Sequence, residues 1–213
     1  MGAEQRMRTP RRAPAAAERG KVAERTRERI VQAAVEEFGA QGYAGARTAG
    51  IAARAGVNPQ LISYYFGGKQ GLLEELRRRW GQTETALAPP DATFAESVAA
   101  YLDATLDRPS WARLVIWQAL GDHPDDAGQQ VAAQREKLSR AVQRIRRRQG
   151  DGELTGDVEA EFILLLAHIV AFAPIAMPQI VEAIYGIDPL STEYRQRCQE
   201  ALLSLVNPER SVQ

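Results

Sequence analysis

Apolar residues recur at helical spacing along most of the chain. Ile30, Ala34 and Phe38 stand four residues apart, so they share one face of a helix expected to begin at Thr26 and end at Gly39. The same periodicity predicts further helices, at about 47–54, 58–66, 69 onward, 92–107, 110–120, 128–149, 157–173, 178–185 and 191–206. No segment alternates in the manner of a strand, so the predicted fold class is all-α.

A Pro-rich break, Ala88-Pro89-Pro90, divides this pattern in two. Because proline and the residue before it disfavour helix, we place a domain boundary at about 85–91. The later helix 157–173 is apolar nearly all round and needs cover on both sides. Its own domain covers one side, and a partner subunit is able to cover the other. The segment Pro174–Pro178 is expected to break this helix and to form a cavity wall.

The stretch 47–69, RTAGIAARAGVNPQLISYYFGGK, predicts two short helices joined by a tight turn. Gly56 suits that turn because it adopts positive φ without strain. Ile51, Val57 and Ile62 are expected to form the core that the two helices share. Asn58-Pro59 is a favourable start for the second helix, with Asn as the cap and Pro in the first turn. This spacing suits a helix-turn-helix.

Charge is distributed unevenly along the chain, although Lys and Arg equal Asp and Glu at 27 each. The basic excess lies in residues 1–80 and the acidic excess in residues 81–213, which favours a basic nucleic-acid module attached to a second domain. Residues 1–25 are predicted to be a disordered basic arm. This arm either solubilises the protein or adds phosphate and minor-groove contacts.

Several classes of protein are disfavoured by composition. Cys198 is the only cysteine, and His123 and His168 lie far apart, so neither a disulfide framework nor a metal site is expected. No catalytic or cofactor motif stands out, so we predict neither an enzyme nor a cofactor. The most apolar stretch, Phe162–Met177, is shorter than the roughly 20 residues of a membrane span. We therefore expect a cytoplasmic protein without a membrane partner.

The run from Thr26 to Leu73 resembles the DNA-binding domain of the tetracycline-repressor-like (TetR) family of bacterial regulators. The matching parts are "AAVEEFGAQGY", "IAARAGV", the helix ending "YYF" and the following "GGKQGLL". The second half matches that family in architecture only. The resemblance implies a helix-turn-helix DNA-binding domain at 26–85 and a helical ligand-binding and dimerisation domain at 91–208. It also implies a homodimer that binds double-stranded DNA at a palindromic operator, as a repressor released by a small-molecule effector.

The resemblance also places DNA contacts on this chain. Gln60 suits adenine, and Leu61 suits a thymine methyl group unless it packs in the core. Tyr65 is either a backbone contact or a half-buried core residue. Arg47, Thr48 and Lys69 lie where the family contacts phosphate. The full expected set is Arg47, Thr48, Asn58, Pro59, Gln60, Leu61, Ser63, Tyr64, Tyr65 and Lys69.

A ligand cavity is expected in the second domain, lined by apolar groups with a few polar ones. His168 is either a satisfied core histidine or a polar group that faces the cavity or the subunit interface. The alternative for the whole lining is an ordinary core. The predicted lining is Trp111, Trp117, Phe162, His168, Phe172 and Met177.

The helix 128–149 is rich in arginine between residues 135 and 148. Its basic side chains either form a solvated face that pairs with acids or make a second nucleic-acid surface. Two other functions remain open from the sequence. One is a helix-turn-helix protein without a ligand, and the other is an enzyme or carrier that uses the second domain's cavity.

Overall fold

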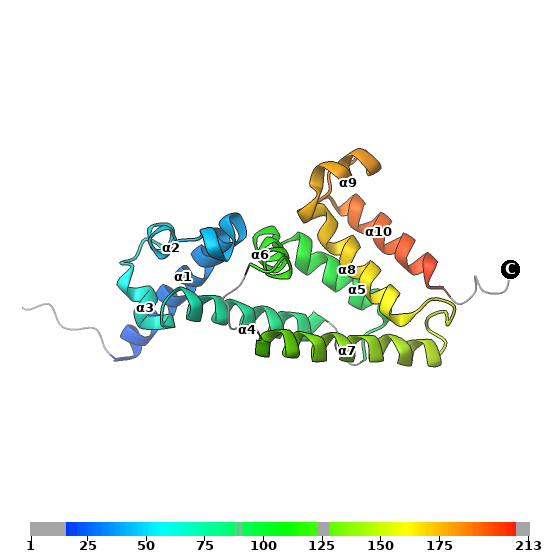
Figure 1. Cartoon of the computed structure of the whole chain (residues 1–213), viewed down its shortest axis with the longest axis horizontal. Helices are drawn as coiled ribbons and strands as arrows, with labels where there is room; N and C mark the ends of the chain where they lie inside the picture. Colours follow the sequence, from blue (N-terminus) through cyan, green and yellow to red (C-terminus); the bar gives the residue numbers. More distant parts are fainter. Residues whose placement is uncertain (1–15, 88, 90, 123–127, 208–213) are drawn as a thin grey trace, which may run out of the picture.

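The computed structural model describes residues 16–87, 89, 91–122 and 128–207 (Figure 1). Within these ranges the chain forms ten helices and no strand, which confirms the all-α prediction. The helices are α1 (Ala16–Gly45), α2 (Thr48–Ala55), α3 (Gln60–Phe66), α4 (Lys69–Leu87), α5 (Phe94–Leu106), α6 (Pro109–Ala119), α7 (Gly128–Gly150), α8 (Ala160–Ala176), α9 (Pro178–Tyr185) and α10 (Thr192–Leu205).

The N-terminal helices α1 to α4 enclose one hydrophobic core. Phe38 of α1, Ile51 of α2, Ile62 of α3 and Leu72 of α4 are all fully buried in it. These residues stand at the apolar positions of the sequence pattern, so burial of their faces fixes how the short helices pack. Another member of this core, Leu114, comes from α6, so the core continues into the second half of the chain.

The first helix begins earlier than its pattern predicts. Residues 16–25 are helical and not disordered, while residues 1–15 of the predicted arm lie outside the described part. Ala, Glu, Lys and Arg dominate this stretch and are strong helix formers, which explains the extension. The Thr26 hydroxyl donates to the Val22 carbonyl at 2.8 Å, one turn back, so Thr26 does not cap the helix.

The same helix also continues past Gly39, with a kink at Gly42 (φ 68°, ψ 179°). Helix α6 docks at this point. The Trp117 indole Nε1 donates to the Gly39 carbonyl at 3.2 Å, and the Asp122 carboxylate accepts from the backbone N–H of Tyr43 and of Ala44. Asp122 thus caps the helical turn that follows the kink.

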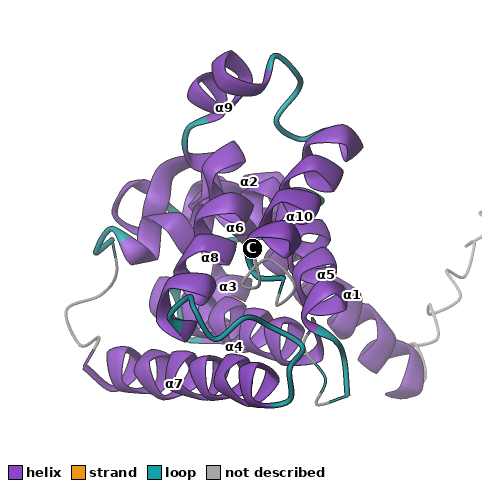
Figure 2. Ribbon diagram, turned by 90° about the vertical axis from the view of Figure 1, so that its right-hand side faces the viewer, coloured by secondary structure: helices purple, strands orange, loops and turns teal. Residues whose placement is uncertain are grey.

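The C-terminal domain is built from α5, α7, α8 and α10 around a second core, with Leu102, Ile163 and Leu202 among its most buried residues. The short α9 stands away from this bundle (Figure 2). The predicted boundary at 85–91 begins in the last turn of α4 and ends before α5.

Helix α8 runs through Pro174 to Ala176, contrary to the break that the sequence predicts at Pro174. Proline leaves the carbonyl four residues earlier, that of Val170, without its helical donor. The Tyr194 hydroxyl of α10 donates to this carbonyl at 3.0 Å. The missing bond is thereby replaced from a neighbouring helix, and the chain turns only at Met177.

Among the described residues, no single helix has the length and hydropathy to cross a membrane. The pair α8 and α9 meets those criteria only when taken together, and the two helices are bent by 105°.

Candidate nucleic-acid interface and effector cavity

The turn between α2 and α3 has the geometry that a helix-turn-helix needs. Gly56 lies in the left-handed region (φ 62°, ψ 42°), as its place in the sequence predicts. The backbone N–H of Val57 donates to the Ala52 carbonyl at 3.0 Å and closes the turn. The Asn58 side chain accepts from the Gln60 N–H at 2.9 Å, so Asn58 supports the start of α3, which begins at Gln60.

One face of α3 is exposed and the other is anchored. Gln60, Ser63 and Tyr64 are exposed, with Tyr64 at 78%, whereas Ile62 is fully buried. Asn58 and Pro59 are exposed in front of the helix. The exposed face therefore offers an amide, a hydroxyl and a phenol on a rigid helix, the groups that contact bases and phosphates in DNA complexes.

Leu61 and Tyr65 take intermediate positions. Both are partly buried and pack against the N-terminal core. The Tyr65 ring contacts the Tyr64 ring edge-on at a centroid distance of 4.9 Å. Leu61 and Tyr65 therefore pack against the core, and only part of each side chain is available to a ligand.

The expected phosphate contacts lie beside the ends of α1, α2 and α4. Arg47 is exposed directly before α2, and Thr48, the first residue of α2, is half-buried. The Lys69 ammonium lies 3.4 Å from the Ala44 carbonyl and 4.4 Å from the centre of the Tyr43 ring. Lys69 is therefore held at the end of α1 as a fixed positive charge.

Two arginines of α1, absent from the predicted set, tie that helix to the motif. The Arg29 guanidinium donates to the carbonyls of Ala55 and Gly56, the last residue of α2 and the turn glycine. Arg27 stacks over the Phe66 ring at 5.3 Å. The partners of both side chains are more than 25 residues away in the sequence, so helical periodicity alone does not predict these contacts.

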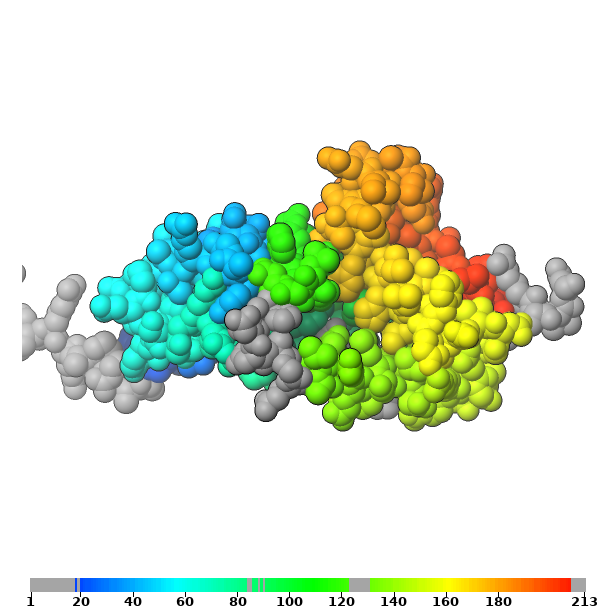
Figure 3. Space-filling view, viewed as in Figure 1, coloured from blue at the N-terminus to red at the C-terminus, as the bar shows by residue number. Residues whose placement is uncertain are grey.

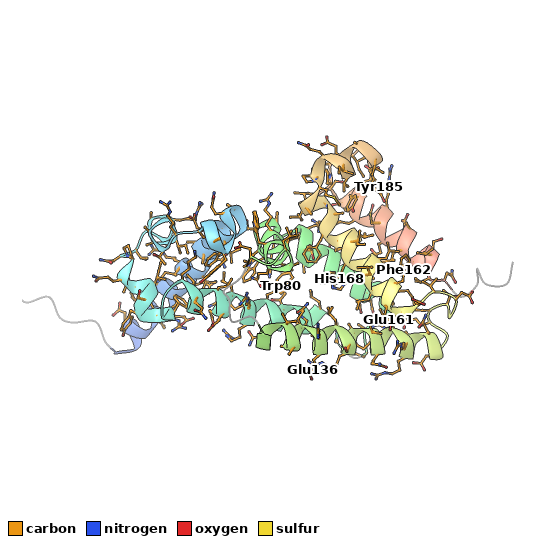
Figure 4. The ribbon with its side chains drawn as sticks, viewed as in Figure 1. Trp80, Glu136, Glu161, Phe162, His168 and Tyr185 are labelled. Carbon is orange, nitrogen blue, oxygen red and sulfur yellow. The ribbon has the colours of Figure 1, made fainter. Side chains whose placement is uncertain are left out.

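A cavity of about 130 Å³ lies in the C-terminal domain, between the end of α4 and helices α5, α7, α8 and α10. Its described lining is mostly apolar, with Tyr101, His168, Lys137, Arg144 and Arg148 among the polar groups. His168 comes from the side of α8 that faces the cavity (Figure 4). The His168 Nδ1 atom lies 2.8 Å from the Leu164 carbonyl, so Nδ1 donates and Nε2 is the remaining polar atom.

Of the six predicted lining residues, only His168 is part of this cavity. Trp111 stacks on Trp80 at 5.9 Å, and Trp117 bonds to Gly39, so both belong to the contact between the domains. The Phe172 ring stacks on the His168 ring, with 6.5 Å between the ring centroids. Phe162 and Met177 are about half exposed on the outside. Aromatic character identifies apolar surface, but it does not distinguish a cavity wall from an interface.

The basic residues of α7 divide between the surface and the cavity. On the surface, Arg140 pairs with Glu136 at 3.0 Å, and Arg146 pairs with Glu161 of α8. Lys137 and Arg144 instead line the cavity, where burial lowers the pKa of both groups, that of Lys137 to about 8. The solvated-face interpretation therefore describes only part of this helix.

An apolar stripe follows the outer side of α8. Phe162, Leu165 and Ile169 are each at least 50% exposed and stand three and four residues apart, so they share one face. Ile180 and Ile184 add exposed apolar surface on α9, which projects from the molecule (Figure 3). Apolar surface of this extent is typical of an interface with another protein.

Fold and site together define a helix-turn-helix DNA-binding protein with a separate, cavity-bearing helical domain. Residues 30–76 match the model of bacterial regulatory proteins of the tetR family, and residues 94–205 match the tetracyclin repressor-like C-terminal domain. The chain therefore belongs to the TetR family of transcriptional regulators.

Relatives and solved structures agree with this assignment. The HTH-type transcriptional repressor SCO4008 of Streptomyces coelicolor is 30% identical over 171 residues, which are 76% of this chain and 85% of that protein. The HTH-type transcriptional repressor NicS of Pseudomonas putida is 33% identical over 48% of this chain and 52% of its own. The structure of the transcriptional regulator SCO4942 of Streptomyces coelicolor is 27% identical, with a TM-score of 0.65 over 85% of this chain and 98% of its own.

Proposed function

We propose that the protein is a repressor that binds a palindromic operator as a two-fold homodimer and is released by a small molecule. The exposed face of α3 carries this proposal, because Gln60, Ser63 and Tyr64 are presented on a helix whose back is fixed by Ile62. Such a helix enters the major groove in helix-turn-helix complexes. The repressor role is supported by two relatives that are named as repressors.

Residues in the N-terminal part of α3 contact the bases. The Gln60 amide matches the N6 and N7 atoms of adenine, and the exposed edge of Leu61 matches a thymine methyl group. Asn58, Pro59 and Ser63 border the same groove. Tyr64 and Tyr65, with Arg47, Thr48 and Lys69, contact the sugar-phosphate backbone and set the register.

The homodimer forms through α8 and α10. The stripe Phe162, Leu165 and Ile169 is apolar and exposed, and Leu205 of α10 is 40% exposed. A second copy that covers this stripe removes the apolar surface from water. Two-fold symmetry then sets two α3 helices about 34–36 Å apart, in successive major grooves.

Light scattering tests the dimer. Leu165→Glu places a charge in the stripe and is expected to give monomers and weak operator binding. Leu120→Glu is the control, since Leu120, at 75%, is even more exposed than Leu165, at 55%, but lies at the end of α6. A dimeric Leu165→Glu variant would contradict this interface.

The cavity is the proposed effector site. Leu87, the last residue of α4, is part of its lining, and α4 begins at Lys69, three residues after the end of α3 (Figure 1). The 19 residues of α4 thus span about 28 Å between the two sites. A ligand that shifts the end of α4 moves α3 relative to its partner copy and weakens operator binding.

Selection of bound sequences from random double-stranded DNA tests the function as a whole. The expected result is a palindrome whose half-sites lie about one helical turn apart, near 10 base pairs. Binding is expected to weaken by orders of magnitude between about 50 and 200 mM salt, because phosphate contacts release counterions. Recovery of unrelated sequences, without symmetry, would contradict the proposal.

A further inference from the structure

The cavity in the C-terminal domain has an excess of positive charge. Lys137, Arg144 and Arg148 all line it from α7. Their spacing of seven and four residues places them on one face of that helix. No Asp or Glu stands among the lining residues that the structure describes. Glu136, the acid closest to them in sequence, is exposed on the outer side of α7 and pairs with Arg140 (Figure 4).

Arg144 differs from Arg148 in having no partner among the residues that the structure describes. Arg148 is engaged, because its guanidinium donates to the Ala92 carbonyl at 2.6 Å and to the Ser97 hydroxyl at 3.1 Å and lies 3.4 Å from Glu153. For the half-buried Arg144, no hydrogen bond or ion pair joins it to any described residue. Burial and the nearby arginines lower its pKa. A partly buried cation without a counterion is energetically unfavourable, and a bound anion would offset this cost.

The cavity is also lined by four neutral polar residues, and two of them, Tyr101 and His168, bear on what it binds; the other two are Ser97 and Gln134. The Tyr101 hydroxyl makes no hydrogen bond within the described residues, and burial raises its pKa, so it stays protonated and able to donate. The His168 ring lies 5.3 Å from the Tyr101 ring and has only Nε2 left for a ligand. The other lining residues are mostly apolar, chiefly Val98, Leu102, Leu138, Ile145 and Leu164.

We propose that this cavity binds a small organic carboxylate, with the carboxylate on Arg144 and an apolar body against the aliphatic wall. The Tyr101 hydroxyl donates to the second carboxylate oxygen, and Lys137 adds positive potential. A volume of about 130 Å³ is close to that of the roughly 150 Å³ apolar cavity that holds benzene, so the body is one aromatic ring or a short alkyl chain. The inference deepens the proposed function, since it gives the effector its chemical class.

Matched ligands test the charge requirement. Benzoate is negatively charged, benzamide is neutral and benzylamine is positively charged, and all three contain one aromatic ring. Hexanoate, hexanamide and hexylamine form the same charge series on an alkyl chain. Each is added to the full-length protein at neutral pH, with Tm and calorimetric Kd as readouts. At least one carboxylate is expected to raise Tm and to bind with Kd below about 10 mM. The matching amide and amine are expected to bind at least about tenfold more weakly.

Variants of α7 test whether Arg144 binds the carboxylate. Arg144→Gln is expected to weaken carboxylate binding by about ten- to hundredfold, the effect of a lost charge-assisted hydrogen bond. Arg140→Gln is the matched control, one turn away and exposed, and is expected to bind as the wild type does. Without ligand, Arg144→Gln is expected to melt no lower than the wild type, because an unpaired cation has been removed. An arginine that served only stability would lower Tm when replaced.

Three results would overturn the inference: equal binding of a carboxylate and its amine, unchanged carboxylate binding by Arg144→Gln, or no carboxylate bound below about 10 mM. Operator affinity, measured with the same samples, separates this inference from the proposed function. Carboxylate binding without loss of operator affinity supports the anion site and contradicts the effector role. Operator binding without any carboxylate binding overturns the anion site and leaves the DNA-binding function in place.

Discussion

Neighbouring residues of α3 have different tasks, and the difference arises from which side of a seven-residue helix each one occupies. Gln60 and Tyr64 are exposed, Ile62 is buried, and Leu61 and Tyr65 lie between. The sequence predicted the motif because Gly56 and the buried apolar positions are local features. The sequence could not decide whether Leu61 and Tyr65 pack in the core or face a ligand, since their partial burial depends on how α3 packs against α1 and α4.

Gln60 and Lys69 are expected to respond differently to truncation. Gln60→Ala removes the proposed base contact and should relax specificity at one operator position, by about 1–3 kcal/mol. Lys69→Ala removes the proposed phosphate contact and should weaken binding to all sequences alike, with a salt slope reduced by about 1. Titration against single-base operator variants at several salt concentrations measures both effects. Unchanged affinity in both variants would show that the interface lies elsewhere.

Lys137 predicts a pH dependence of stability. Burial, and then Arg144, lower its pKa from 10.5 to about 8, so between these values the unfolded chain binds more protons than the folded one. The free energy of unfolding should therefore rise with pH from about 8 to 10.5, relative to Lys137→Met. Melting both proteins across this range measures the difference. A constant difference would mean that Lys137 titrates normally in the folded state.

At the scale of helices, local signals predicted most boundaries, and the failures have identifiable causes. The bounds of α9 agree with the sequence because Pro178 and Gly186 mark both ends. The ends of α1 and α8 differ because distant groups compensate for the local breaker. Asp122 caps the turn after Gly42, and Tyr194 satisfies the carbonyl that Pro174 leaves open.

The pair Pro174 and Tyr194 is expected to be energetically coupled. Tyr194→Phe leaves the Val170 carbonyl without a donor and should lower the free energy of unfolding by about 1–3 kcal/mol. Pro174→Ala restores the helical N–H, so Tyr194→Phe should be less harmful in that background. A double-mutant cycle by urea denaturation measures this coupling. Tyr185→Phe is the control, because the Tyr185 hydroxyl has only a weak contact with the Cys198 thiol at 3.5 Å. Additive effects in the cycle would contradict the assignment.

At the scale of the molecule, the two halves are joined more closely than the sequence suggests. The charge difference between them predicted two domains with separate roles, and the DNA-binding half was predictable from its motif. The cavity could not be predicted from the sequence, because its walls come from five helices and only the packed fold brings Tyr101, Arg144 and His168 together. Two of the predicted aromatic lining residues, Trp111 and Trp117, lie instead at the domain contact, where Leu114 and Trp111 of α6 pack on the N-terminal core.

Asp122 is expected to hold this contact, and the three tryptophans of the chain report on it. Trp80, Trp111 and Trp117 all lie where α6 meets α1 and α4, so their fluorescence follows the contact while circular dichroism follows all helices. Asp122→Ala removes the acceptor for two backbone N–H groups and should destabilise the contact by about 1–3 kcal/mol. In the variant, the fluorescence transition should then come at lower urea than the dichroism transition.

The wild type, by contrast, should unfold with both signals at the same urea concentration, as a single cooperative unit does. Asp151→Ala is the matched control, because Asp151 is exposed in the turn after α7, away from the domain contact. If Asp122→Ala kept coincident transitions at the wild-type midpoint, the carboxylate would not hold the domains together. The apolar packing of Leu114 and Trp111 would then be sufficient to join the C-terminal domain to the DNA-binding domain.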